Sequence, residues 1–166
     1  MRKKHADLFL GIFMLLLFAL LADRGVLRVS ETSALPESAP PVVVIDSGHG
    51  GDDPGKVGIN QSREKEINLA IAKRLEALLK QADVAVVMTR TDNNGLYDEN
   101  ASGKKVQDMK RRVSMMEEAK ADLAVSIHQN SYPDPAIKGA QVFYYTSSVE
   151  GKQLAKRLQE RLVKGL

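Results

Sequence analysis

The chain has 166 residues, 43% of them hydrophobic, which is enough for one domain with a packed core. It contains no cysteine, which excludes a disulfide scaffold and any zinc site built on thiolates. The formal charge is +3, but Arg2, Lys3 and Lys4 minus Asp7 already supply +2 of it at the N-terminus, so no basic surface for nucleic-acid binding is expected.

The first 29 residues have the layout of an export signal. Three basic residues precede an unbroken apolar run from Leu8 to Ala22. This run is short for a membrane span, which needs about 20 residues. A good cleavage site directly after it is lacking, so the sequence leaves open whether the segment is removed or anchors the protein. Residues 30–41, rich in Ser, Pro, Ala and Glu, are predicted to be a linker.

From residue 42 onward, strands and helices are predicted to alternate. The apolar, β-branched run at 42–45 is typical of a strand buried on both faces, and a glycine-rich loop at 48–58 follows it. A helix is predicted at 64–81, and its spacing of apolar residues predicts an inward face made of Ile67, Ile71, Leu75 and Leu78. A second buried strand is predicted at 84–88.

The second half of the chain continues the alternation. A polar stretch at 91–105 precedes a second helix, which is predicted to run through Val106, Met109, Val113 and Met116. Strands are predicted at 123–126 and 141–145, and a final helix is predicted from residue 149 onward. This order predicts an α/β layered domain around a largely parallel sheet.

Three residues could hold a metal at one rim of this sheet. His49 and His128 each follow a predicted parallel strand, and Glu64 opens the first helix. Ligands bind at the carboxyl ends of the strands in open α/β sheets, so we expect the three side chains to share that rim. Two imidazoles and one carboxylate with an open fourth position are a known arrangement for catalytic zinc. His5 belongs to the export segment and is set aside.

Each of these residues also has a purely structural interpretation. A histidine at a strand end is often a hydrogen-bonded loop residue, and Glu64 could simply complement the helix dipole. The neighbouring glycines could make a tight turn. They do not form a phosphate-binding loop of the Walker type, because Lys56 is followed by Val57. The coincidence of all three residues on one rim favours the metal site.

Four ordered blocks of sequence are shared with a known family. They are IDSGHGG at 45–51, EKEINL at 64–69, MTR at 88–90 and ADLAVSIHQN at 121–130. In these blocks the chain resembles the zinc-dependent N-acetylmuramoyl-L-alanine amidases of the amidase 3 type, and residues 139–145 look like the family's next strand. The similarity runs from about residue 42 to the last residue. Ser47 stands where the family usually has proline, which should affect loop stiffness more than chemistry.

The resemblance implies a three-layer sandwich around a mostly parallel sheet, with 42–166 as the catalytic domain. It also implies that His49, Glu64 and His128 are ligands of Zn²⁺. Arg90, Arg112 and Asn130 match recurrent positions of the family. None of these three is expected to be catalytic, and the structural interpretations are a strand-end salt bridge, a helix-surface charge and a turn residue respectively.

Enzymes of this family cleave the amide bond between N-acetylmuramic acid and L-alanine of the peptidoglycan stem peptide by a zinc-activated water. The export segment that leads straight into the domain and the polar insert before the second helix are most similar to the spore-cortex or germination-specific branch. In that branch the peptide is removed on the way to muramic-δ-lactam. The resemblance implies an exported envelope enzyme with peptidoglycan as its substrate. It leaves open membrane anchoring through the N-terminal segment and an activator protein.

The family also uses a second glutamate, in a Glu-x-Gly-Phe setting on a later strand, to accept and return a proton. Glu150 and Glu160 both fall in the polar pattern of the final helix, so neither replaces it. We therefore expect this general base beyond Leu166, and the domain to be C-terminally incomplete, as in a fragment or an interrupted reading frame. The alternatives are an inactive, envelope-tethered module that binds peptidoglycan or a partner protein, and a zinc peptidase acting within the stem.

Overall fold

The computed structural model describes residues 14, 39–134 and 136–165. The chain divides into two units, Met1–Pro40 and Pro41–Leu166, and the strands found among the described residues belong to the second. The export segment predicted at 1–29, apart from Met14, and most of the linker predicted at 30–41 lie outside the described residues. Among the residues that are described, no helix is both long and apolar enough to span a membrane.

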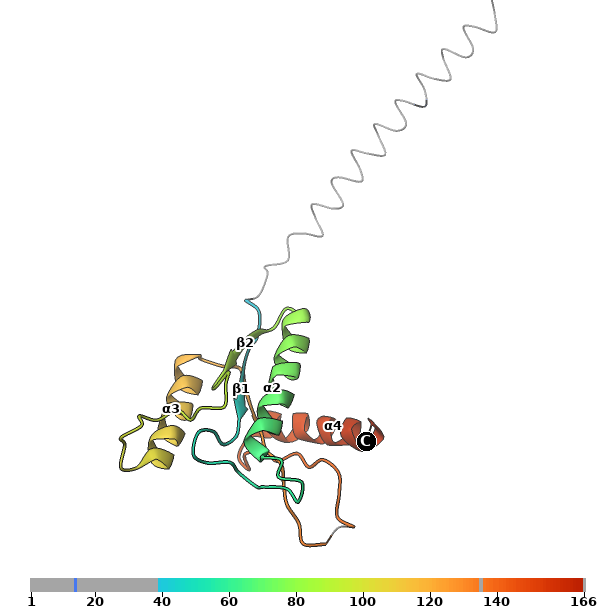
Figure 1. Ribbon diagram of the computed structural model, residues 1–166. Helices are drawn as coiled ribbons and strands as arrows, with labels where there is room; N and C mark the ends of the chain where they lie inside the picture. The colour runs from blue at the N-terminus through green and yellow to red at the C-terminus, as the bar shows by residue number, and fades with distance from the viewer. Residues whose placement is uncertain (1–13, 15–38, 135, 166) are drawn as a thin grey trace, which may run out of the picture. The chain divides into compact units, whose positions relative to one another are not determined.

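The described part of the chain contains one sheet of three parallel strands, in the order β2-β1-β3 (Figure 1). The strands are β1 (Val42–Ser47), β2 (Ala85–Met88) and β3 (Leu123–Ile127). The central strand β1 is almost wholly buried because it is paired on both sides, as its continuous apolar run predicted. The flanking strands are only partly buried, although 84–88 was predicted to be a buried strand.

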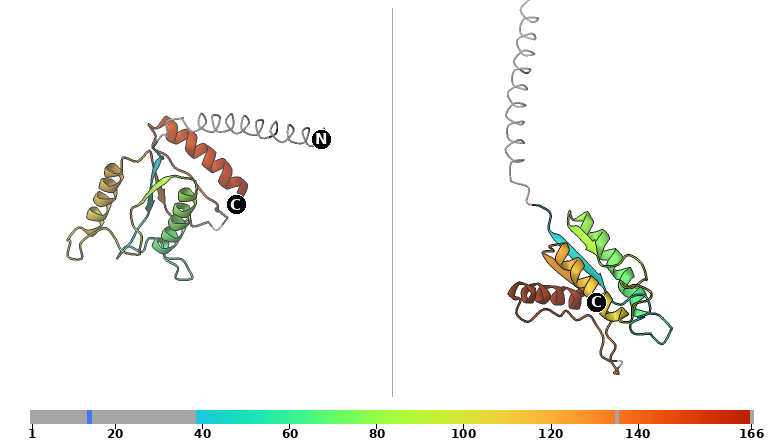
Figure 2. Two further views of the ribbon diagram at one scale, coloured as in Figure 1. Left: turned by 90° about the horizontal axis from the view of Figure 1, so that it is seen from above. Right: turned by 90° about the vertical axis from the view of Figure 1, so that its left-hand side faces the viewer.

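Three helices complete the fold: α2 (Glu64–Gln81), α3 (Lys104–Glu118) and α4 (Val149–Gly165). Helices α2 and α3 lie on opposite sides of the sheet, which makes three layers (Figures 1 and 2). This arrangement confirms the predicted α/β fold. The apolar core lies between α2 and the sheet, and its buried members are Val43, Ile45, Leu69, Ala72 and Met88.

The predicted inward face of α2 is largely wrong. Leu75 packs against the core, but Ile67, Ile71 and Leu78 are exposed, Leu78 by 63%. The residues that α2 buries are instead Glu64, Lys65, Asn68, Leu69 and Ala72. The helix is rotated relative to the predicted face. Its first turns direct polar side chains toward the carboxyl ends of the strands, where these side chains form hydrogen bonds.

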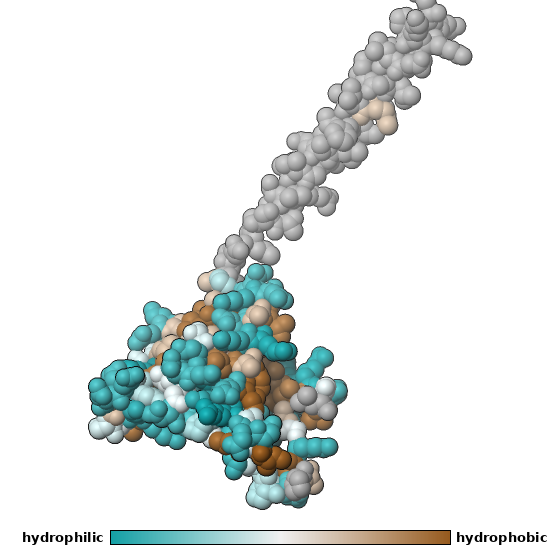
Figure 3. Space-filling view, in the orientation of Figure 1, coloured by the Kyte–Doolittle hydropathy of each residue, from teal (hydrophilic) through white to brown (hydrophobic). Residues whose placement is uncertain are grey.

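The helix predicted through Val106, Met109, Val113 and Met116 forms as α3, but it does not bury its apolar residues. Val106, Met109 and Val113 are exposed, and the buried residue of this helix is Arg112. A polar contact with β1 therefore decides how α3 is oriented, and the apolar positions of α3 remain at the surface. Figure 3 shows apolar side chains reaching the surface among the hydrophilic ones.

The strand predicted at 141–145 does not form. The N–H of Val142 donates to Oε1 of Gln159 at 2.9 Å, and Nε2 of Gln159 donates to the carbonyl of Ala140 at 2.9 Å. The Gln159 side chain of α4 thus forms hydrogen bonds with backbone groups that would otherwise pair with a neighbouring strand. In keeping with the missing strand partner, Phe143 and Tyr145 are each 79% exposed.

Candidate metal centre

The structure brings His49, Glu64 and His128 together at the carboxyl edge of the sheet. Because β1 and β3 are neighbours and run parallel, the residues that follow them lie side by side. Nε2 of His49 and Nδ1 of His128 each lie 3.2 Å from Oε1 of Glu64. One potential ligand atom from each residue lies within 4.8 Å of the other two.

His49 is oriented by a carboxylate on the far side of its ring. Nδ1 of His49 lies 3.0 Å from Oδ2 of Asp53. Burial opposes ionisation of Asp53, but its contacts with His49 and with the N–H of Gly55 hold its pKa below the ordinary value. An ionised carboxylate can only accept, so the contact with Asp53 favours a proton on Nδ1 of His49 and leaves Nε2 as the nitrogen that can bind a cation beside Glu64.

Glu64 is a buried carboxylate held by backbone donors. Its Oε2 accepts from the N–H of Lys56 at 2.8 Å, and its Oε1 accepts from the N–H of Gln129 at 2.9 Å. Burial raises the pKa of Glu64, but these N–H groups, with a longer contact from Asn68, lower it more, so the net pKa lies below the ordinary value. Glu64 is therefore an anion at neutral pH, which is the form that binds a cation.

Two glycines leave the space that the three side chains need. A Cβ on Gly48 would lie 2.2 Å from Cε1 of His128, and a Cβ on Gly55 would lie 2.7 Å from Glu64 and from His49. Gly55 also has a φ of +67°, which favours glycine. These two positions admit the rings and the carboxylate only because they carry no side chain.

The donor set fits a divalent cation. Ligand atoms about 2.0–2.1 Å from one tetrahedral ion are roughly 3.3–3.4 Å apart, and two of the three separations here are 3.2 Å. A carboxylate facing the lone pair of an imidazole is unfavourable without a proton or a cation between them. The arrangement of these residues can therefore hold a metal ion and leave a coordination position free.

Comparison with known proteins agrees with this geometry. Residues 43–166 match the family model described as N-acetylmuramoyl-L-alanine amidase. The germination-specific N-acetylmuramoyl-L-alanine amidase of Bacillus subtilis is 35% identical over 170 residues. The chain belongs to the N-acetylmuramoyl-L-alanine amidase family. The resemblance predicted from the four sequence blocks is thereby confirmed.

The relatives are longer than this chain. The alignment to the Bacillus subtilis amidase covers 100% of the chain and 71% of that protein. The amidase AmiA of Escherichia coli is 34% identical, over 80% of this chain and 42% of that protein. The structure of the CwlD amidase from Clostridioides difficile in complex with the GerS lipoprotein is 34% identical with a TM-score of 0.71, covering 75% of this chain and 66% of that one. These matches confirm the α/β amidase fold.

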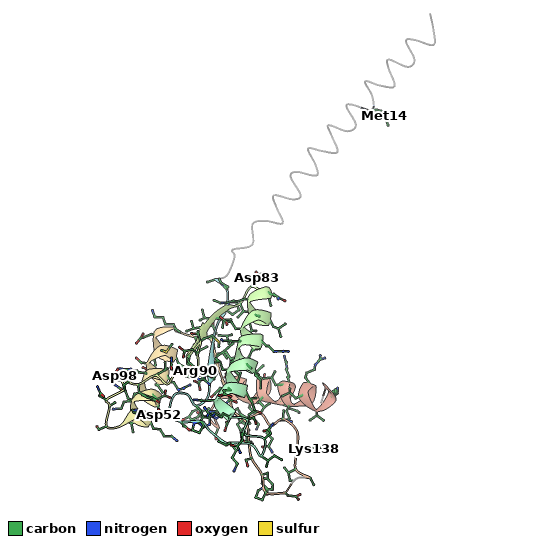
Figure 4. All side chains as sticks on the ribbon, in the orientation of Figure 1. Met14, Asp52, Asp83, Arg90, Asp98 and Lys138 are labelled. Carbon is green, nitrogen blue, oxygen red and sulfur yellow. The ribbon has the colours of Figure 1, made fainter. Side chains whose placement is uncertain are left out.

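Two other residues singled out in the sequence, Arg90 and Arg112, are buried. Arg90, labelled in Figure 4, follows β2 and donates to the carbonyls of Ser47 and Gly48. Arg112 is only 2% exposed, so its interpretation as a helix-surface charge is wrong. Asn130 is exposed and donates to Oε1 of Gln141 at 3.2 Å, which fits its interpretation as a turn residue.

Sequence reasoning missed two residues that support the site. Asp53 orients His49, and Asn68 joins Gly48, Glu64 and Gln129 by hydrogen bonds. The signal for Asn68 was its place four residues after Glu64, on the same side of the helix. Nothing in the sequence distinguished Asp53 from the adjacent Asp52, because loop geometry decides which carboxylate faces the ring.

A pocket of about 220 Å³ opens beside the candidate centre. It lies between the loop that follows β1 and the start of α3. Its lining includes His49, Asp52, Asp53, Tyr97, Lys104 and Asp108. A substrate group can therefore approach His49 from this side.

Proposed function

We propose that this chain is a zinc-dependent N-acetylmuramoyl-L-alanine amidase. Its reaction is hydrolysis of the amide bond between N-acetylmuramic acid and the L-alanine of the peptidoglycan stem peptide. The observation that carries the proposal is the convergence of His49, Glu64 and His128 at the strand ends, in a chain of the amidase family. Family membership favours a hydrolase over a module that only binds peptidoglycan.

The proposed ligands of Zn²⁺ are His49, Glu64 and His128. When bound, zinc would polarise the amide carbonyl and activate a water molecule. The residues around the ligands prepare the site: Asp53 holds the proton on Nδ1 of His49, and the N–H groups of Lys56 and Gln129 fix the Glu64 carboxylate. Such outer contacts orient ligands and raise their basicity.

Amide hydrolysis also needs a group that accepts a proton from water and returns it to the leaving amine. The carboxylates that line the pocket beside His49 include Asp53 and Asp108, but both are occupied. Asp53 faces His49 and Gly55, and Asp108 accepts from the N–H of Leu96 and from Arg112. We assign no general base to the described residues, and the expected glutamate of a Glu-x-Gly-Phe segment is not in the 166 residues.

The names of the relatives support a cellular setting. One relative is a germination-specific amidase, and one structural neighbour is a complex with a lipoprotein. We infer an exported enzyme that acts on peptidoglycan in the cell envelope during spore-cortex maturation, in contact with an activator protein. The basic and apolar residues at the start of the chain support export, by a cleaved signal or by a membrane anchor.

The test starts with metal content. After dialysis, the parent chain is expected to retain about one zinc per molecule, and His49→Ala and His128→Ala are expected to lose it. His5→Ala is a matched control, since His5 lies in the predicted export segment. If both site variants retain zinc like the parent, the ligand assignment is wrong.

The second measurement identifies the bond that is cut. Peptidoglycan incubated with the protein should release peptides that begin with a free L-alanine amino group. A free amino group on a later residue of the stem would instead indicate a peptidase. Sedimentation with peptidoglycan without any new amino termini would indicate the binding module.

A further inference from the structure

Two arginine side chains hold the loop that carries His49 by donating hydrogen bonds to its backbone carbonyls. The carbonyl of Ser47 accepts from Nε of Arg90 and Nη1 of Arg112, each at 2.9 Å. The carbonyl of Gly48 accepts from Nη2 of Arg90 at 3.0 Å, and the carbonyl of His49 accepts from Nη2 of Arg112 at 2.7 Å. Three consecutive carbonyls are thus bound by two buried guanidinium groups.

Arg112 uses each edge of its guanidinium for a different partner. Nη1 donates to Oδ1 of Asp46 at 2.6 Å, and Nε donates to Oδ2 of Asp108 at 2.5 Å. The remaining nitrogen reaches the His49 carbonyl. A planar group with five N–H donors can donate to acceptors in β1, in α3 and in the loop at the same time, whereas a lysine ammonium is a single point charge.

His49 itself has an unusual backbone conformation. Its φ is +64°, in the left-handed region that non-glycine residues seldom occupy. Such a conformation persists when the surroundings fix it. His49 is fixed at two points, since Asp53 contacts its ring and Arg112 contacts its carbonyl.

We propose that Arg112 is a positioning residue for the metal ligand His49. By holding the His49 carbonyl, its guanidinium keeps the backbone in the conformation from which the imidazole meets Glu64 and His128. The inference rests on the proposed metal site. It adds to that site a residue from the opposite layer of the fold, 63 positions along the chain from His49.

The decisive variant is Arg112→Lys. It keeps the positive charge beside Asp46 but cannot contact Asp46, Asp108 and the His49 carbonyl together. We expect a folded protein whose Kd for zinc rises about 10- to 100-fold, as for lost outer-shell contacts in other metal sites. The visible absorption of the Co²⁺-loaded protein should also change, since it reports ligand geometry without any need for activity.

A matched control is Thr89→Val. Thr89 is buried, donates to the same Asp46 at 2.9 Å and accepts a longer contact from Nη1 of Arg112 at 3.4 Å, but its side chain forms no hydrogen bond with the carbonyls of Ser47, Gly48 and His49. This variant should lose stability and keep the parent's zinc affinity and Co²⁺ spectrum. An Arg112→Lys protein with the parent's affinity and spectrum would overturn the inference and leave Arg112 a purely structural residue.

If Arg112→Lys shows no cooperative unfolding transition, Asp108→Asn decides. This substitution leaves the Arg112–Asp46 ion pair in place and removes the charge that holds Nε. A Kd several-fold above that of the parent supports the positioning of His49, and an unchanged Kd overturns it. A parent chain that binds neither metal would instead refute the proposed function, so the two failures are distinguishable.

Discussion

The substitution Gly48→Ala separates metal binding from stability. An added Cβ would lie 2.2 Å from Cε1 and 2.3 Å from Nε2 of the His128 ring. To reach an ordinary contact of 3.4 Å, the ring must move by about 1.2 Å. Zinc–nitrogen distances tolerate only about 0.2 Å, so the ring can no longer share an ion with His49 and Glu64.

The cost of this movement to the fold should be small. The His128 side chain is 47% exposed, so the ring can rotate toward solvent without displacing the core. Alanine in place of glycine, where φ is not positive, also reduces the entropy of the unfolded chain and adds about 0.4–1 kcal/mol of stability. We therefore expect Gly48→Ala to keep the melting temperature of the metal-free parent and to bind zinc at least about 10- to 100-fold more weakly.

The assay is a competitive zinc titration against a chromophoric chelator, with thermal unfolding of the metal-free protein followed by circular dichroism. Gly103→Ala is the matched control, because a Cβ there meets only Val106, at 4.0 Å. The control should bind zinc like the parent. Parent-like affinity in Gly48→Ala would refute the reasoning, since it would mean that His128 does not need its present position to bind the metal.

Three further substitutions test the surroundings of the site. Glu64→Gln removes the anionic ligand and should abolish zinc retention on dialysis, which elemental analysis measures. Asp53→Asn cannot hold the proton on Nδ1 of His49 as a carboxylate does and should weaken zinc binding about 10- to 100-fold in the same titration. Burial opposes ionisation of Asp46, but Ser126 and Arg112 hold its pKa below 3.8. The stability that ionised Asp46 contributes is therefore complete above that value and is lost as the pH falls below it. Between pH 6 and pH 3, the free energy of unfolding in urea should fall less in Asp46→Asn than in the parent.

The sheet and the convergence of the candidate ligands could be predicted because strong, local signals determine them. The β-branched run before His49 is typical of a buried strand, and in the structure the apolar run before His128 forms the strand that pairs beside it. Parallel strands present their carboxyl ends at one edge. A histidine after each of two neighbouring strands therefore lies at that edge whatever the details of the loops.

The helix faces could not be predicted by the same reasoning. Apolar periodicity assumes that a helix orients itself by burying apolar side chains. In α3 the buried side chain is instead Arg112, which pairs with Asp46 of β1, 66 positions away in the chain. Such a pair cannot be recognised from the spacing within one helix, and the apolar residues Met109 and Val113 consequently remain exposed.

The strand predicted at 141–145 failed for a related reason. Its β-branched and aromatic residues, from Val142 to Tyr145, have the composition of a strand, but a strand also needs a partner for its backbone. In the described chain, the backbone groups of Ala140 and Val142 bond to Gln159 instead. Strand propensity describes how well side chains fit a half-buried sheet and does not supply that sheet.

The buried ion pair between Arg112 and Asp46 is better explained by geometry than by stability. Replacing a buried ion pair with well-packed apolar residues is often neutral or even stabilising, whereas removing one partner costs about 3–5 kcal/mol. The pair is therefore weak evidence for a gain in stability, and melting temperatures alone would show Arg112 only as a residue that is costly to remove. Its contact with the His49 carbonyl gives it a second consequence, at the candidate metal centre. Metal affinity measured on a folded variant separates these two consequences. Substitution of Arg112 in a purely structural pair would lower the melting temperature and leave the metal affinity unchanged.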